Sequence, residues 1–237
     1  MKENHNLQND YVEIGGIKWA TKCIGASSPY TYDAYLFQWG ETSGHKEESG
    51  PITYYDYSWT NAPFNGGNSS YDSDAWKNYS DTVMSNNVLA SSYDAAAQLM
   101  GESPLKGYSW RLPTFDELDT LESLKLTLTN TTVKGVDGAE ITIGSDEGVG
   151  TVNSVIGMCF GNTTTSTDNI LFLPFRGFGD GSRLDFFSHA SGIWGASVEP
   201  LDATEYAWSL TFSRFSVSFL GSIRNLGFCI LGVLGKD

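Results

Sequence analysis

The sequence predicts a single α+β domain, in which two helices pack on short antiparallel sheets and much of the chain is irregular loop. Residues 92–100 and 113–124 each combine a helix start signal with helical periodicity. Short apolar runs bounded by turn residues recur along the rest of the chain and favour strands. The 237 residues show no internal repeat and no linker-like segment, which indicates one domain.

The N-terminal part predicts a frayed end, a hairpin and a long insert. Residues 1–10 are polar, and we expect them to be disordered or frayed. Residues 11–24 predict two short strands around the turn Gly15-Gly16. Residues of about 45–80 form a polar, loop-like insert. A structureless loop of this length is unusual in a compact domain, so its many aromatic side chains predict that it packs down.

Both predicted helices have recognisable ends. Ser92 is the expected N-cap of a helix over 93–100, which contains three consecutive alanines and stops at Gly101. Thr114 and Glu117 form a capping box at the start of the second helix, in which each side chain satisfies a backbone N–H of the first turn. The apolar residues of this second segment then line one face as far as residue 124.

The remaining regular structure is predicted as strand. Tyr206, Trp208, Leu210 and Phe212 alternate with small or polar residues, which is typical of a half-buried strand. The predicted strands after the second helix cover residues 139–143, 157–160, 170–174, 206–212 and 228–234.

Charge limits the classes of partner. The chain carries 28 acidic and 14 basic residues, a net charge of −14. This excess repels nucleic acid and anionic membrane surfaces, so we expect neither as a partner. The longest apolar run is far too short to span a bilayer, so we expect no membrane insertion. Residues 172–237 contribute only −1 and hold 9 of the 13 phenylalanines, so an acidic body precedes an aromatic tail.

The sequence predicts no catalytic site, no metal site and no cofactor. The chain has three cysteines, Cys23, Cys159 and Cys229. They are too few and too scattered for a disulfide framework or a zinc site, although their number allows one disulfide. Residues 72–74 (DSD) could form half of a calcium site, but they lack an ordered calcium-loop pattern, so structural calcium is not indicated. Arg111 is interpreted as a buried cation paired with a carboxylate rather than as an anion-binding residue.

The aromatic tail is the unusual part of the chain. Residues 183–196 and 213–226 contain many apolar side chains without a clean period of 2 or 3.6. Such side chains cannot all point inward from one regular element. Exposed aromatic residues among Ser, Gly and Arg are typical of a binding surface. An irregular core is the alternative, and composition alone favours neither.

Several short motifs occur in an order and spacing that cover nearly the whole chain. They are 11–14 (YVEI), 18–21 (KWAT), 24–29 (IGASSP), 39–42 (WGET), 93–96 (YDAA), 109–114 (SWRLPT), 117–118 (EL), 171–174 (LFLP), 176–178 (RGF), 192–194 (GIW), 206–212 (YAWSLTF) and 224–227 (RNLG). With these motifs the chain resembles the C-type lectin-like domains of the formylglycine-generating-enzyme type. It is most similar to phage and bacterial variable proteins of diversity-generating retroelements. The resemblance implies a C-type lectin fold over residues 11–237.

The departures from the family pattern fall in the tail. Residues 193–196 (IWGA) replace a Tyr-Trp-Ser-Ser motif, and residues 227–233 (GFCILGV) replace a Gly-x-Ser-Val-Arg-x-Val pattern. The resemblance implies a variable region of about 183–231 whose side chains meet the ligand on one face. The ligand-binding residues it implies are Arg183, Phe186, Phe187, Ser188, His189, Ser191, Ile193, Gly195, Ala196, Arg214, Phe215, Ser216, Ser218, Phe219, Leu220, Ser222, Ile223, Leu226, Phe228, Cys229 and Leu231.

Three functions follow from these observations. The resemblance favours a hypervariable receptor-binding or surface-display protein that is not an enzyme, and the apolar side chains favour a protein or cell-surface ligand. A carbohydrate-binding lectin is the first alternative, although Glu-Pro-Asn and Trp-Asn-Asp signatures are missing. A formylglycine-generating enzyme is the second alternative, but Cys159 and Cys229 do not sit in matching motifs. No signal peptide is recognised, and the resemblance suggests a phage virion or a cell surface as the location.

Overall fold

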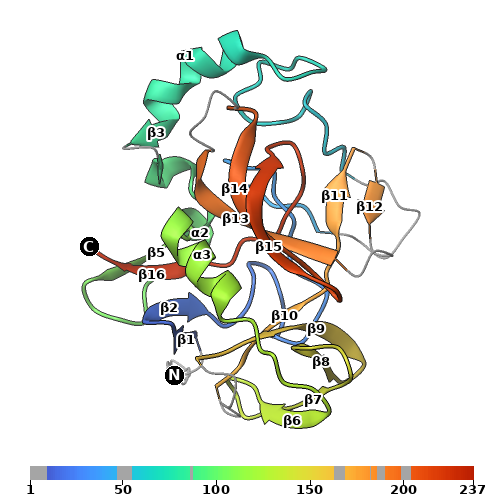
Figure 1. The fold of residues 1–237 in the computed structure, drawn as a ribbon. Coiled ribbons are helices and arrows are strands. Elements are labelled where there is room, and N and C mark those ends of the chain that lie inside the picture. The colour runs from blue at the N-terminus through green and yellow to red at the C-terminus, as the bar shows by residue number, and fades with distance from the viewer. Residues whose placement is uncertain are drawn as a thin grey trace.

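The computed structural model describes residues 10–46, 55–85, 88–162, 169–181, 183–185, 190–198 and 204–237. The expected frayed end therefore lies almost entirely outside the described residues. Figure 1 shows small sheets arranged along the long direction of the molecule, with the first helix at one end and the sheet that contains β6 to β10 at the other. No helix in the described ranges is long and apolar enough to cross a membrane.

Both ends of the described chain meet in one four-stranded sheet of order β1-β2-β16-β5. Its strands are β1 (Tyr11–Ile14), β2 (Ile17–Ala20), β16 (Val233–Lys236) and β5 (Tyr108–Arg111). The β1–β2 hairpin turns at Gly15 and Gly16, with φ of 60° and 76°, as the sequence predicts. The predicted final strand, 228–234, is only partly correct. Residues 228–232 cross the core irregularly, with isolated bridges from Phe228 to Phe37 and from Cys229 to Ile193.

A five-stranded antiparallel sheet of order β10-β9-β8-β7-β6 forms the end of the molecule opposite the first helix, residues 73–83 (Figure 1). Its strands are β6 (Thr131–Lys134), β7 (Glu140–Ile143), β8 (Val149–Val152), β9 (Val155–Phe160) and β10 (Leu171–Pro174). Three of these strands are predicted from the sequence. The sheet closes over its own buried cluster, which includes Ile141, Cys159 and Phe172.

The third main sheet holds most of the aromatic tail. Its order is β13-β14-β15, from β13 (Ala190–Val198), β14 (Tyr206–Ser213) and β15 (Val217–Ile223). All pairs are antiparallel, and the register shifts between Trp194 and Val198. Two small hairpins complete the strands, namely β3 (Met84–Ser85) with β4 (Val88–Leu89) and β11 (Phe178–Asp180) with β12 (Arg183–Asp185).

The predicted α+β class is wrong, because the molecule is mostly β-sheet. The described residues are 41% strand and 14% helix. Their three α-helices are short, namely α1 (Ser73–Val83), α2 (Ala95–Leu99) and α3 (Phe115–Ser123). The two predicted helical segments shrink to α2 and α3. The expected architecture of two helices packed on short sheets, and with it the C-type lectin fold that the resemblance implies, is therefore corrected to several small antiparallel sheets with three short helices. The sequence underestimates strand content because the buried strands β8 and β13 show no clean alternation.

The helix starts show which local signals are reliable. The Thr114–Glu117 capping box is present, and Glu117 Oε2 also accepts from the Thr114 N–H at 2.8 Å. The predicted Ser92 cap is wrong. Ser91–Tyr93 is a 3₁₀ turn, and Asp94 caps α2 by accepting from the N–H groups of Ala96 and Ala97. Asp94 also accepts from the Leu112 N–H at 2.8 Å, so a contact with a distant segment, which the local sequence does not show, fixes it as the cap.

The insert is packed down where the structure describes it. It contains α1, which the sequence analysis missed and which Asp72 caps. Asp72, which belongs to the segment that could form half of a calcium site, therefore has a structural role as the N-cap of α1. Tyr57 holds the insert to the core, because its ring lies between two glycines. A Cβ added at Gly179 or Gly227 would lie 2.1 or 2.3 Å from that ring.

Arg224 attaches the other half of the insert. Its guanidinium is buried among four aromatic rings, with centroids 4.1 to 6.0 Å away. Burial lowers the pKa of Arg224 to about 10, against the nearby Tyr71 and Glu205, which raise it. The ring faces replace part of the lost hydration of this cation. The four rings belong to Trp39, Trp59, Tyr71 and Trp76.

Two buried tryptophans join the N-terminal half to the central sheet. Trp39 Nε1 donates to the Gly195 carbonyl at 2.9 Å, and Trp194 Nε1 donates to the Phe37 carbonyl at 2.8 Å. Both indoles have zero exposure. Each indole therefore donates to a backbone carbonyl within two residues of the other tryptophan.

This pair makes a stability prediction. Trp39→Phe keeps an aromatic ring but leaves the buried Gly195 carbonyl without its donor, so we expect a loss of about 2–4 kcal/mol in the free energy of unfolding. Urea unfolding followed by far-UV circular dichroism measures it. Trp208→Phe, at a half-buried tryptophan, is the control and should lose roughly 1 kcal/mol or less. Equal losses in the two variants would contradict the role of the hydrogen bond.

Candidate functional site

The predicted ligand-binding residues separate into buried and accessible groups. Eight of them are interior, and their side chains cannot meet a ligand from solution. The expected exposure is wrong for Ser191, Ile193, Gly195, Ala196, Ser222, Phe228, Cys229 and Leu231.

Close packing explains why these positions are interior. A Cβ at Gly195 would lie 2.8 Å from Leu118 Cδ1 and 3.0 Å from the Trp208 carbonyl oxygen, so a side chain does not fit there. Phe228 packs against Trp194 with ring centroids 4.6 Å apart. Strand β13 is covered on both faces, which the sequence could not reveal because its small residues read as a turn-rich loop.

The accessible candidates lie on the β14–β15 hairpin and the chain that follows it. Arg214, Phe215, Ser216, Leu220 and Ile223 are exposed, whereas Ser218, Phe219 and Leu226 are half-buried. Phe186, Phe187, Ser188 and His189 lie outside the described residues. Arg183 belongs to β12, but its side chain also falls outside the description.

A partly exposed aromatic cluster lies where α3 crosses this hairpin. Trp208 and Phe219 stack with centroids 4.9 Å apart and an interplanar angle of 28°. Phe115, at the start of α3, meets both rings edge-on at 4.8 and 4.7 Å. Cross-strand register places Ile223 on the same face as Phe219. We call these four residues the β15 patch.

The sequence analysis missed two members of the β15 patch. The sequence pattern places Phe115 on the inward face of its helix, yet 41% of its surface is exposed. The signal for this exposure is that Phe115 is the first residue of α3, because the end of a helix can extend past the sheet on which the helix packs. Trp208 was read correctly as part of a half-buried strand, but not as a surface residue.

The turn of the hairpin presents one more aromatic side chain. Phe215 has 87% of its surface exposed. The Ser213 hydroxyl oxygen accepts from the N–H groups of Phe215 and Ser216, which fixes the turn. Arg214 is held by an ion pair with Asp146 at 3.1 Å. The phenyl ring therefore projects from a defined turn.

Acidic side chains border the β15 patch. Asp116 and Asp119 on α3 are exposed, and Glu122 is half-buried. Asp119 and Glu122 follow Phe115 by four and seven positions, so they share its side of the helix. We call Asp116, Asp119 and Glu122 the α3 acidic stripe. This stripe gives the apolar surface a negatively charged border.

Arg111 pairs with a carboxylate, as predicted, but it is half-buried rather than buried. It forms a bidentate pair with Glu117, with both N···O distances at 2.7 Å. The pKa of Glu117 is lowered, because the bonds from Arg111 and the Thr114 backbone outweigh burial, which alone would raise it. The pair braces the start of α3 next to the β15 patch.

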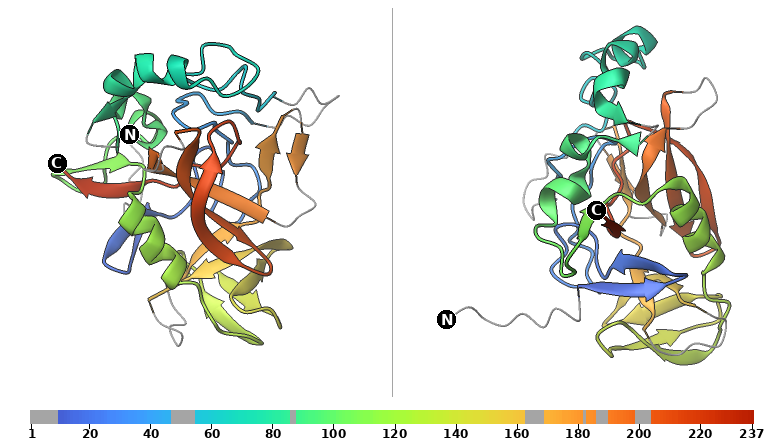
Figure 2. Two further views of the ribbon diagram at one scale, coloured as in Figure 1. Left: turned by 45° about the horizontal axis from the view of Figure 1, so that its top comes forward. Right: turned by 90° about the vertical axis from the view of Figure 1, so that its left-hand side faces the viewer.

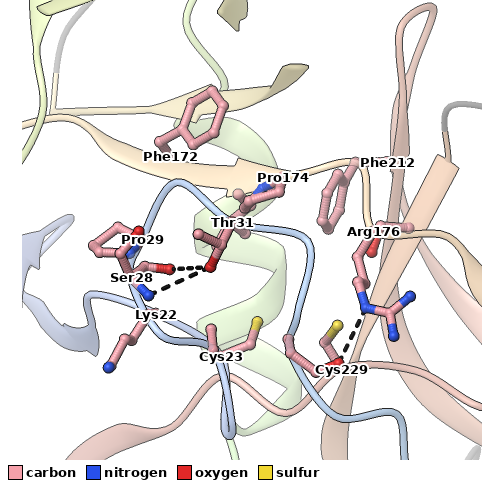
Figure 3. Close-up of a pocket in the computed structure, with 14 residues that line it drawn as sticks. Lys22, Cys23, Ser28, Pro29, Thr31, Phe172, Pro174, Arg176, Phe212 and Cys229 are labelled. Carbon is pink, nitrogen blue, oxygen red and sulfur yellow. Dashed lines mark hydrogen bonds between the residues drawn. The ribbon is translucent and has the colours of Figure 1, made fainter. Parts of the chain in front are cut away.

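Figure 3 shows the cavity in which two thiols meet. Cys23 and Cys229 both line a cavity of about 20 Å³, with Arg176 and Ser191 beside them. The hydrogen bond between the thiols lowers the pKa of Cys229 and raises that of Cys23. This volume holds little more than one water molecule, so it admits no substrate. Cys159, which the enzyme alternative would pair with Cys229, belongs to another buried cluster, and burial raises its pKa.

No group of three or more histidine, cysteine or acidic side chains positioned to hold a metal ion occurs in the described ranges. His45, the described histidine, lies 2.6 Å from Glu41 and stacks on Tyr55 at 3.4 Å. This contact ties the start of the insert to the preceding loop.

Thiol accessibility is a direct check on this arrangement. Cys159 and Cys229 are buried and Cys23 is half-buried, so alkylation of the native protein should modify Cys23 first, and slowly because its pKa is raised. Mass spectrometry of digested protein, before and after unfolding in urea, measures the order. Cys23→Ser should then leave the native protein almost unlabelled. Rapid labelling of native Cys229 would contradict the closed cavity.

Comparisons with protein-family models, with curated proteins and with solved structures found no match for this chain.

Proposed function

We propose that this protein is a ligand-binding protein without catalytic activity. Its binding surface is formed by the β15 patch and the turn carrying Phe215. The observation that carries the proposal is the combination of an 87% exposed phenylalanine in the hairpin turn with a partly exposed aromatic cluster where α3 crosses the same hairpin. Large aromatic side chains at a rigid surface are the usual anchors of protein interfaces.

The chemistry of the patch favours a protein ligand. Carbohydrate-binding aromatic residues offer an open ring face on which a sugar stacks. Here Trp208 is already stacked on Phe219, and Phe115 contacts both rings. These ring–ring contacts already use part of each aromatic surface, and Ile223 adds an exposed aliphatic side chain, so the patch suits an apolar peptide surface better than a sugar.

Panning a displayed peptide library on the immobilised protein tests this function. We expect apolar peptides to be enriched and Phe215→Ser combined with Ile223→Ser to weaken their binding by about tenfold or more. Leu99→Ser, at a leucine of α2 that is 45% exposed, is the matched control and should bind normally. Binding that needs calcium, or selective binding on a glycan array, would support the lectin alternative instead.

We also propose that the accessible candidates of the hairpin are sites of retroelement-directed variation. Support comes from their exposure, since substitutions at such positions cost little stability. The neighbouring DNA should contain a reverse-transcriptase gene and a template repeat. That repeat should differ from the codons for residues 213–223 at adenines. A repeat whose adenines instead match the buried positions of β13 would contradict this reading.

A further inference from the structure

Strand β15 is an edge strand. It pairs with β14 on one side, and nothing in the described part of the chain pairs with its other side. Figure 2 shows β15 on the outer surface of the molecule, next to α3. A row of backbone N–H and C=O groups is therefore presented outward.

This edge lacks the usual protection against strand pairing. Its seven residues, VSFLGSI, include no charged side chain and no proline. Natural proteins block exposed edges with lysine, proline or a bulge. All seven residues pair in regular register with β14, so β15 carries no bulge either.

Side-chain hydrogen bonds show which backbone groups face outward. The hydroxyls of Ser209 and Thr211 on β14 donate to the carbonyls of Leu220 and Ser218, at 3.2 and 3.3 Å. These two carbonyls therefore point toward β14. The N–H and C=O groups of successive residues in a strand point to opposite sides. Those of Phe219 and Gly221 therefore point to the open side of β15.

We infer that β15 binds its protein ligand by strand addition, and that this ligand is an extended apolar segment flanked by lysine or arginine. The inference rests on the proposed function and specifies its partner. Backbone hydrogen bonds to the open edge supply affinity, and the β15 patch accepts the apolar side chains of one face of the added strand. The α3 acidic stripe borders this patch and attracts the flanking cations.

Charge argues for such a segment over a second copy of this chain. Two molecules of net charge −14 repel each other, and pairing two β15 edges would bring two acidic stripes together. Arg214 is the one cation on the hairpin, and it is already engaged with Asp146.

A matched set of labelled peptides tests the inference. The probe is a short peptide of alternating valine and threonine with lysines at both ends, and its binding is followed by fluorescence anisotropy. N-methylation of the peptide backbone at alternate residues should lower affinity by about tenfold or more, because it removes strand hydrogen bonds without changing the protein. Replacing the lysines by glutamates should lower it by a similar factor.

Two protein variants locate the contact. Leu220→Lys places a cation on the edge strand and should weaken binding of the lysine-flanked peptide by about tenfold. Leu99→Lys makes the same chemical change at a similarly exposed leucine of α2 and should not. Hydrogen exchange of the full protein should show new protection at the Phe219 and Gly221 amides on peptide binding.

The outcomes separate this inference from the function on which it rests. Binding that depends on the β15 patch but tolerates N-methylation would overturn strand addition and keep the proposed function. Absence of binding by the peptide up to its solubility limit would also overturn it. A dimer in sedimentation that Leu220→Lys dissociates would assign the edge to a second copy and overturn the peptide partner.

Discussion

The reciprocal hydrogen bonds of Trp39 and Trp194 are the constraint on which the rest of the architecture depends. They join the loop after β2 to β13 across more than 150 residues, with both indoles fully buried. Buried donors and carbonyls that lose each other cost far more than the same groups in water. The central sheet is therefore fixed in position from its β13 side, and its opposite strand, β15, is left at the surface.

The β14–β15 hairpin is held rigidly on its β13 side and is exposed on its β15 side. Strand β13 is packed on both faces, whereas β14 and β15 meet α3 through the aromatic cluster and end in a turn held by Ser213. The Arg111–Glu117 pair fixes the start of α3. A surface with aromatic anchors held this way loses little conformational entropy on binding.

The same packing limits which positions could vary. A retroelement that altered β13 would place side chains against Leu118 or Phe228, at a cost typical of overpacked cores. In the hairpin turn Phe215 is 87% exposed, so a substitution there displaces no packed neighbour among the described residues, and a substitution of Arg214 removes its ion pair with Asp146. The acidic body offsets the aggregation tendency that an apolar edge brings, because like charge keeps molecules apart.

The sequence by itself determined the local features, namely the Gly15-Gly16 hairpin, the capping box of α3, the strands with clear turn boundaries and the Arg111 pairing with a carboxylate. Each depends on neighbouring residues. Only the tertiary structure decided the fold class, the α1 helix, the burial of β13 and the meeting of Cys23 with Cys229. It also decided which aromatic residues reach the surface. Those features arise from contacts between distant segments, and apolar residues without periodicity look alike in sequence whether they fill a core or border an open edge.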